Sequence, residues 1–254
     1  MSKKSATRNV AVSISHFRMD FGKKTVIKDL SFEVYKGEIF GFLGSNGSGK
    51  TTTIRALLGL YQPTSGDLLI DGKPFSVSSG IKLGYLPEER GLYKNESVID
   101  VMSYFGRLKG LDVSEAKKQA MDYLDRINLS DKAKTRIDKL SSGQQQKIQL
   151  GITIMNNPEL LILDEPTKGF DPVNRRLLMD IVEEHQRRGA TIIFVTHQME
   201  EVERLCDRAI LLKDGVSYAY GTIADIKKKF SGASLDDIFI RVYGDENEKT
   251  KENS

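Results

Sequence analysis

Apolar residues along this chain follow two periods, and the places where the period changes predict its secondary structure. Alternation of apolar and polar side chains predicts strands at 10–15 and 30–35. Largely apolar runs predict strands buried on both faces at 38–43, 160–163 and 191–195. Segments with helical spacing follow these runs, at 51–58, 173–188 and 199–205. Strands and helices that alternate in this order predict an α/β fold.

The pattern changes between 97 and 129, where apolar residues take helical spacing with no strand between them. These residues are Val98, Val101, Met102, Phe105 and Leu108, followed by Ala116, Ala120, Leu124 and Ile127. We therefore expect a helical insert at about 90–158 in an otherwise alternating chain. The residues from 244 to 254 are charged and lack apolar side chains, which predicts a disordered tail.

Composition narrows the class of protein. The chain has 254 residues, of which 39% are hydrophobic and 29% charged, as in ordinary globular proteins. Its net charge of +3 is a small excess, which predicts a solvated surface and no nucleic-acid partner. The single cysteine, Cys206, excludes an internal disulfide. Residues 1–9 are polar and no apolar run approaches about 20 residues, so we expect neither a secretory signal nor a membrane span.

A glycine-rich loop joins the strand at 38–43 to the helix at 51–58, and it fits the phosphate-binding pattern G-x-x-x-x-G-K-[ST]. Glycines let successive N–H groups face one concavity, and the helix start adds a positive dipole end. We expect Lys50 to reach the β- and γ-phosphates and Thr51 to meet Mg²⁺. The expected nucleotide-binding residues here are Gly44, Ser45, Asn46, Gly47, Ser48, Gly49, Lys50, Thr51 and Thr52. A chance surface loop is the alternative.

Two carboxylates, Asp164 and Glu165, end the apolar strand at 160–163. Ligands of parallel sheets bind at the carboxyl ends of strands, so we expect Asp164 to face the metal held by Thr51. Glu165 would then orient an attacking water and act as its base. His197 ends the strand at 191–195 in the same way and could bond a γ-phosphate or the water. The alternatives are an unrelated strand-end acid and a structural histidine.

Five motifs in order resemble those of the ATP-binding subunits of ATP-binding-cassette (ABC) transporters, and the resemblance covers 9–243. Besides the loop and the acidic strand, Leu140–Gln144 resembles the signature L-S-G-G-Q, and 169–172 resembles the D-loop, which contains Asp171. His197 stands at the switch-histidine position, and Phe21 takes the place of the aromatic that stacks on adenine. The resemblance implies a P-loop NTPase core with a mostly parallel central sheet, an antiparallel N-terminal β subdomain and an inserted helical subdomain.

The signature also has a physical interpretation, because its residues begin a helix and so offer a second anion site. The residues concerned are Ser141, Ser142, Gly143 and Gln144. In the family, ATP lies between the phosphate loop of one subunit and the signature of another, which implies a dimer with a second copy or a paralogue. It also implies Mg²⁺, ATP hydrolysis and a membrane-spanning permease, with this subunit cytoplasmic and peripheral on the inner face of the cell membrane.

Three positions depart from the family pattern. Glu88 replaces the Q-loop glutamine and adds negative charge near the acidic strand end, whereas Ser142 replaces a glycine and Phe21 a tyrosine. The stretches 85–93 and 234–239 resemble an exporter branch that includes bacterial drug-resistance and sodium-efflux systems. Aromatic residues near 93 and 104–105 are either a groove for a helix of the permease or part of the insert core. The rival function is a soluble assembly ATPase, like those of iron–sulfur assembly.

Overall fold

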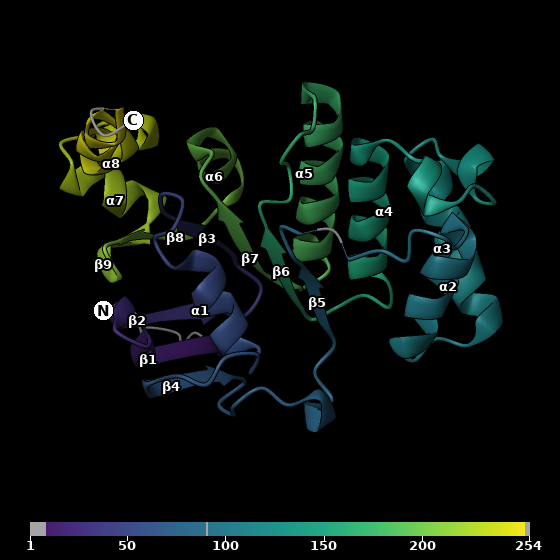
Figure 1. Cartoon of the computed structure of the whole chain (residues 1–254), viewed down its shortest axis with the longest axis horizontal. Coiled ribbons are helices and arrows are strands. Elements are labelled where there is room, and N and C mark those ends of the chain that lie inside the picture. The colour runs from purple at the N-terminus through teal and green to yellow at the C-terminus, as the bar shows by residue number, and fades with distance from the viewer. Residues whose placement is uncertain (1–8, 90, 252–254) are drawn as a thin grey trace, which may run out of the picture. The chain divides into compact units, whose positions relative to one another are not determined.

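The structure, a computed structural model, describes residues 9–89 and 91–251 and consists of two compact units (Figure 1). The second unit is Gly80–Ala190, and the segments on either side of it in the sequence form the first unit. The division follows the sequence, because the second unit contains the predicted helical insert.

The first unit contains an antiparallel N-terminal group of strands and a group that is mostly parallel. The antiparallel strands are β1 (Val10–Phe21), β2 (Lys24–Tyr35) and β4 (Ser65–Ile70). The others are β3 (Ile39–Leu43), β7 (Thr191–Thr196), β8 (Arg208–Lys213) and β9 (Val216–Thr222). Strand β3 lies between β7 and β8 and is parallel to both, while β9 is antiparallel to β8. The order β4-β1-β2-β9-β8-β3-β7 confirms the expected antiparallel β subdomain and parallel strands.

Most helices of the first unit come directly after one of its strands in the sequence (Figure 1). They are α1 (Lys50–Leu57), α6 (Met199–Leu205), α7 (Ile223–Lys229) and α8 (Leu235–Lys251). Helix α8 continues beyond Gly244, where the sequence predicts a disordered tail, and residues 252–254 lie outside the described part. Residues rich in Glu and Lys extend a helix at low cost once Leu235, Ile238 and Val242 have packed, because nucleation is the expensive step.

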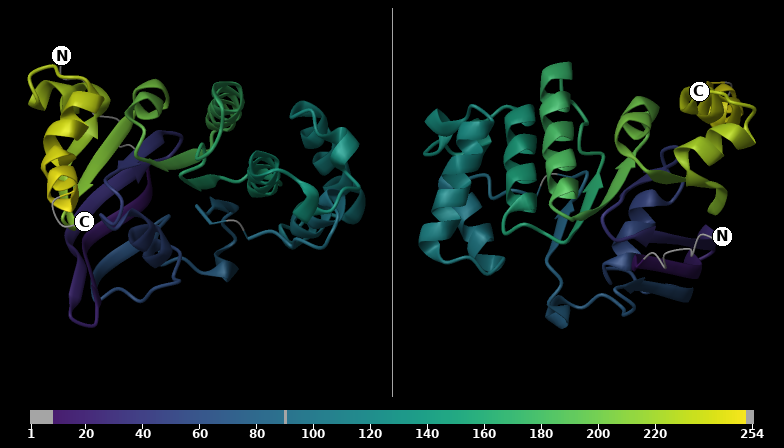
Figure 2. Two further views of the ribbon diagram at one scale, coloured as in Figure 1. Left: turned by 45° about the horizontal axis from the view of Figure 1, so that its top comes forward. Right: turned by 180° about the vertical axis from the view of Figure 1, so that it is seen from behind.

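Among its described residues, the second unit combines two parallel strands with four α-helices and two short 3-10 helices, and Figure 2 shows them from two further sides. The strands are β5 (Leu83–Leu86) and β6 (Leu160–Asp164). The helices are α2 (Val98–Leu108), α3 (Val113–Arg126), α4 (Ser142–Ile154) and α5 (Pro172–Arg187). The first three fall within the predicted insert. Side chains of Ser97, Asp112, Ser141 and Asp171 cap the starts of these helices.

Strands β3, β6 and β7 are buried along their whole length, as their apolar runs predict. In the first unit Leu43 of β3 pairs with Thr196 of β7, so the chain leaves both strands at the same edge. In the second unit Leu86 of β5 pairs with Leu163 of β6, with the same consequence. Each unit therefore collects polar residues at the carboxyl ends of neighbouring parallel strands, where ligands of such sheets bind.

Candidate functional site

The glycine-rich loop of the first unit turns directly from β3 into α1. Gly47 and Gly49 have φ angles of 79° and 108°, a region that side chains with a Cβ rarely adopt. A Cβ on Gly49 would also collide with Cδ1 of Ile27 on β2. The backbone conformation therefore favours glycine at both positions, and the loop curls ahead of the helix as the sequence predicts.

Lys50 begins α1 and is buried, with 7% of its surface exposed. Its ammonium donates hydrogen bonds to the carbonyl oxygens of Gly44 at 2.8 Å and Ser45 at 3.1 Å. The cation is thus held across the start of the loop by groups that are weaker partners than a phosphate oxygen. Thr51 and Thr52 follow on the first turn of α1 and are half-buried.

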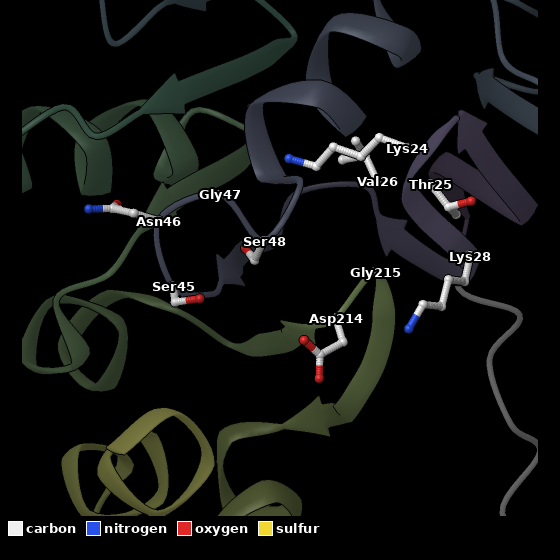
Figure 3. A pocket seen from close by; sticks show the side chains of 10 residues that line it. All are labelled: Lys24, Thr25, Val26, Lys28, Ser45, Asn46, Gly47, Ser48, Asp214 and Gly215. Carbon is white, nitrogen blue, oxygen red and sulfur yellow. The ribbon is translucent and has the colours of Figure 1, made fainter. Parts of the chain in front are cut away.

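A cavity of about 270 Å³ lies along the outer side of the loop (Figure 3). Its lining includes loop residues 45–48 and the start of β2, from which Lys24 and Lys28 add two cations. Asp214 of the β8–β9 turn also lines it. The hydroxyl of Ser48 is buried and has no hydrogen-bond partner among the described residues. Such a group favours a polar ligand in this cavity.

Phe21 ends β1 and pairs with Lys24 at the hairpin turn, so the aromatic side chain belongs to the same hairpin that lines the cavity. Its ring is 44% exposed and meets Tyr61 edge to face at 5.4 Å. An exposed ring held at one edge leaves a face on which a planar base can stack. Sequence reasoning identified Phe21 but missed Lys24, Lys28 and Asp214, because only the folded hairpin brings them to the loop.

His197 leaves β7 beside the point where Gly44 leaves β3, as the pairing of Leu43 with Thr196 dictates. Its side chain is exposed. The turn that carries it is fixed, because the Thr196 hydroxyl donates to the buried Glu201 at 3.2 Å and accepts from the Gln198 N–H at 3.1 Å. The histidine and the phosphate loop thus share one edge of the first unit.

The acidic pair lies in the second unit, at the end of β6. Asp164 is completely buried, and Glu165 is 5% exposed with a φ of 48°. A left-handed backbone at a non-glycine residue is uncommon and marks a position whose geometry is imposed by its surroundings. The following turn is closed by the Lys168 N–H, which donates to the Glu165 carbonyl at 3.1 Å. Glu88 follows the neighbouring strand β5 and forms an ion pair with Lys168 at 2.7 Å.

The signature residues form the start of α4. Ser141 caps the helix by accepting from the Gln144 N–H at 3.3 Å, and its own N–H donates to the Gln144 side chain at 2.9 Å. This reciprocal capping starts the helix at Ser142, within the signature. A Cβ on Gly143 would meet open space, so the first turn is accessible. The signature residues thus form an accessible helix N-terminus.

Asp171 begins α5, where it accepts the Asn174 N–H at 2.9 Å. This bond holds the pKa of its carboxyl below the ordinary value, so it stays ionised at neutral pH. The rings of Tyr93, Tyr104 and Phe105 touch one another within the second unit. Because Tyr93 is 54% and Tyr104 46% exposed, these two tyrosines are surface residues rather than insert core.

The predicted residues therefore fall into two sets. Phe21, the phosphate loop and His197 belong to the first unit. Glu88, Asp164–Glu165, the signature and Asp171 belong to the second unit. In each set the residues occupy loops, helix starts or strand ends, positions that suit binding of a polyanion and acid–base chemistry.

Comparisons with known proteins identify the family. The family model described as ABC transporter matches residues 27–168. An uncharacterized ABC transporter ATP-binding protein of Methanocaldococcus jannaschii is 45% identical over 87% of this chain and 80% of its own length. The linearmycin resistance ATP-binding protein of Bacillus subtilis is 38% identical over 85% of this chain and 70% of its own.

A Nod factor export ATP-binding protein of Rhizobium sp. (strain N33) is 36% identical, over 91% of this chain and 77% of its own. A solved structure titled as the ATP-binding subunit of an ABC transporter superposes with a TM-score of 0.84 at 28% identity, covering 91% of this chain and 99% of that one. The chain therefore belongs to the ABC transporter family and is an ATP-binding subunit of that family.

Proposed function

We propose that the protein hydrolyses ATP as one of two cassettes, paired head to tail, and that it drives a separate membrane permease in export. The observation that carries the proposal is the accessible, reciprocally capped start of α4 at Ser141–Gly143. This second anion site is additional to the phosphate loop, which alone would hold the triphosphate of one ATP. A partner cassette supplies a triphosphate to the second site, and it supplies a signature to the loop of this chain.

The loop binds the phosphates through its N–H groups and through Lys50, whose ammonium exchanges the carbonyls of Gly44 and Ser45 for phosphate oxygens. Phe21 stacks on the adenine ring. Thr51 and Asp164 are the residues that would hold Mg²⁺. This ion commonly takes only one or two oxygen ligands from the protein, here a hydroxyl and a buried carboxylate, and completes its shell with phosphate and water oxygens. When bound, the ion neutralises charge on the phosphate oxygens.

Glu165 acts as the base that orients the attacking water, and His197 bonds the γ-phosphate or that water. The buried position of Glu165 and its fixed left-handed backbone suit a base that must keep one geometry. Glu88 would lie near the water and the metal, and Asp171 would belong to the nucleotide-binding set. The roles of these two follow their places beside the acidic strand end and at the start of α5.

Export and a permease partner are supported by the relatives, two of which are named for linearmycin resistance and for Nod factor export. In the part of the chain that the structure describes, the helices are too short or too polar to cross a bilayer. The permease therefore provides the path across the membrane and holds this subunit at the inner face. The exposed Tyr93–Tyr104 surface is where a permease helix would dock.

The test is Glu165→Gln, which keeps the shape of the side chain and removes its basicity. The variant should bind ATP, hydrolyse it at a small fraction of the wild-type rate and accumulate as an ATP-dependent dimer in size-exclusion chromatography with light scattering. The exposed Glu115→Gln on α3 is the control and should behave as wild type. Turnover near wild type in Glu165→Gln would exclude the base assignment. Purification of the native protein with a soluble partner instead of a polytopic one would favour an assembly ATPase.

A further inference from the structure

The carboxyl-end edge of β5 and β6 in the second unit is strongly acidic. Pairing of Leu86 with Leu163 places Glu88 after one strand beside Asp164 and Glu165 after the other. Like charges at one edge disfavour one another, and a triphosphate that approaches them is itself anionic. The edge therefore needs a cation before it can serve an ATP site.

Lys168 is placed to be that cation. Its ammonium lies 2.7 Å from Oε1 of Glu88. Its backbone closes the turn that begins at Glu165, through an N–H donated to the Glu165 carbonyl at 3.1 Å. The carboxylate of Glu88, and to a smaller extent that of Glu165, raises the pKa of the Lys168 ammonium. One cation thus interacts with the loop after β5 and with the turn after β6.

Helix α4 holds the same two segments from its buried side. The side-chain amide of Gln146 donates to the carbonyl of Pro166, in the Glu165 turn, at 3.4 Å. The side-chain amide of Gln149 donates to the carbonyl of Glu89 at 3.2 Å. Both glutamines are buried, at 4% and 6% exposure, and lie one turn apart on α4. The Lys168–Glu88 pair closes this chain of contacts into a ring that starts and ends at the signature helix.

We propose that Lys168 is a positioning residue for Glu88: it neutralises that carboxylate and holds it against the Glu165 turn, so that the acidic edge accepts a magnesium-bound triphosphate. The inference rests on the proposed ATPase function. It concerns two residues of the ATP site, Glu88 and Lys168, whose charges oppose each other. Glutamine at position 88 would need no counter-charge, whereas glutamate does. Lys168 is therefore the compensation for the acidic residue at the Q-loop position.

A surface ion pair of little consequence is the competing explanation, since the side chains are 41% and 62% exposed and such pairs contribute little to folding stability. The two explanations differ in what they predict. A surface pair leaves nucleotide affinity unchanged when it is removed. A compensating pair leaves an uncompensated carboxylate next to bound phosphates, and only removal of that carboxylate repairs the loss.

The experiment is a double-mutant cycle of Lys168→Met, Glu88→Gln and the double variant, each in the catalytically silent Glu165→Gln background and in the active protein. A fluorescent ATP analogue reports affinity with and without Mg²⁺, and steady-state turnover separates KM from kcat. Lys118→Met on α3 is the matched control, because it breaks an exposed lysine–carboxylate pair of 2.9 Å elsewhere in the same unit. Thermal melting checks that all variants are folded.

We expect Lys168→Met to weaken Mg-ATP affinity about tenfold, the scale of one uncompensated charge near the phosphates. The double variant should return to within about twofold of Glu88→Gln, and Lys118→Met should match the parent protein. Equal affinity in Lys168→Met and its parent, or additive effects in the double variant, would overturn the inference. A parent protein that neither binds nor hydrolyses ATP would instead overturn the proposed function.

Discussion

Replacing Arg208 with methionine should destabilise the first unit strongly, because Arg208 neutralises a carboxylate in the core. Its guanidinium donates to Glu38 at 3.0 Å, and the two side chains are only 8% and 9% exposed. The same group lies over the ring of Tyr35 at 4.4 Å and that of Tyr220 at 4.8 Å. Arg208→Met removes this cation and leaves the Glu38 carboxylate buried.

Breaking a buried pair on one side costs about 3–5 kcal/mol, which for a chain of this size lowers Tm by roughly 6–20 °C. The double variant Arg208→Met/Glu38→Gln should recover at least half of the loss, because the Tyr35 N–H, at 2.8 Å from Glu38, can still bond the amide oxygen. Urea and thermal denaturation monitored by circular dichroism measure both effects.

The loss should also depend on pH, and its sign follows from the pKa of Glu38. Burial already raises that pKa above its ordinary 4.5, against the opposing Tyr35 N–H and Arg208 charge, and loss of Arg208 raises it further. A carboxyl whose folded pKa is raised binds more protons in the folded state, so stability falls as pH rises from 4.5 through the folded pKa. The variant should be closest to wild type near pH 4.5 and furthest from it at neutral pH.

Nucleotide affinity of the folded variant should be unchanged, because Glu38 precedes β3 and the phosphate loop follows it. A loss below about 1 kcal/mol, a double variant less stable than the single one, or a deficit that does not change with pH would refute this account of the Arg208–Glu38 pair.

Two further predictions concern other parts of the chain. Lys109 donates to the Thr153 carbonyl at 2.6 Å, and burial lowers its pKa to about 8 from 10.5. Between these pH values the folded state therefore binds fewer protons than the unfolded state. The free energy of unfolding of the wild type should rise by up to about 3 kcal/mol relative to Lys109→Met as pH rises from 8 to 10.5. Equal pH profiles of the two proteins in urea denaturation would contradict this. Phe21→Ala should weaken ATP binding about tenfold by removing the stacking face, Phe21→Tyr should not, and titration calorimetry showing equal affinity for Phe21→Ala would exclude Phe21 from the adenine site.

The sequence predicts this fold best where the spacing of apolar residues agrees with a local signal, such as a turn glycine or a helix-capping serine. The apolar runs of β6 and β7 are strands buried along their whole length, as predicted. Glycines precede the helix that begins at Lys50, and a capping serine precedes α4. Both helix starts could therefore be identified from neighbouring residues alone.

Prediction from the sequence failed where a bulge interrupts the alternation of a long strand, and where two interacting residues are far apart in sequence. Strand β1 extends to Phe21 rather than ending at Ser15, because His16, with a φ of 48°, sits in a bulge that interrupts the alternation. The partners Glu88 and Lys168 are 80 residues apart, so no periodic pattern could connect them. Their contact exists only because β5 and β6 pair in parallel.

The central claim is that one ATP site needs the phosphate loop of one cassette and the signature of another. Lys50→Ala should abolish turnover through the loop, and Ser141→Arg should abolish it through the signature. In a mixture of the two inactive variants, some dimers contain one site with an intact Lys50 loop and an intact partner signature, so ATP turnover should partly return. If the mixture stays as inactive as its components while each variant still dimerises with wild type, the head-to-tail account is contradicted.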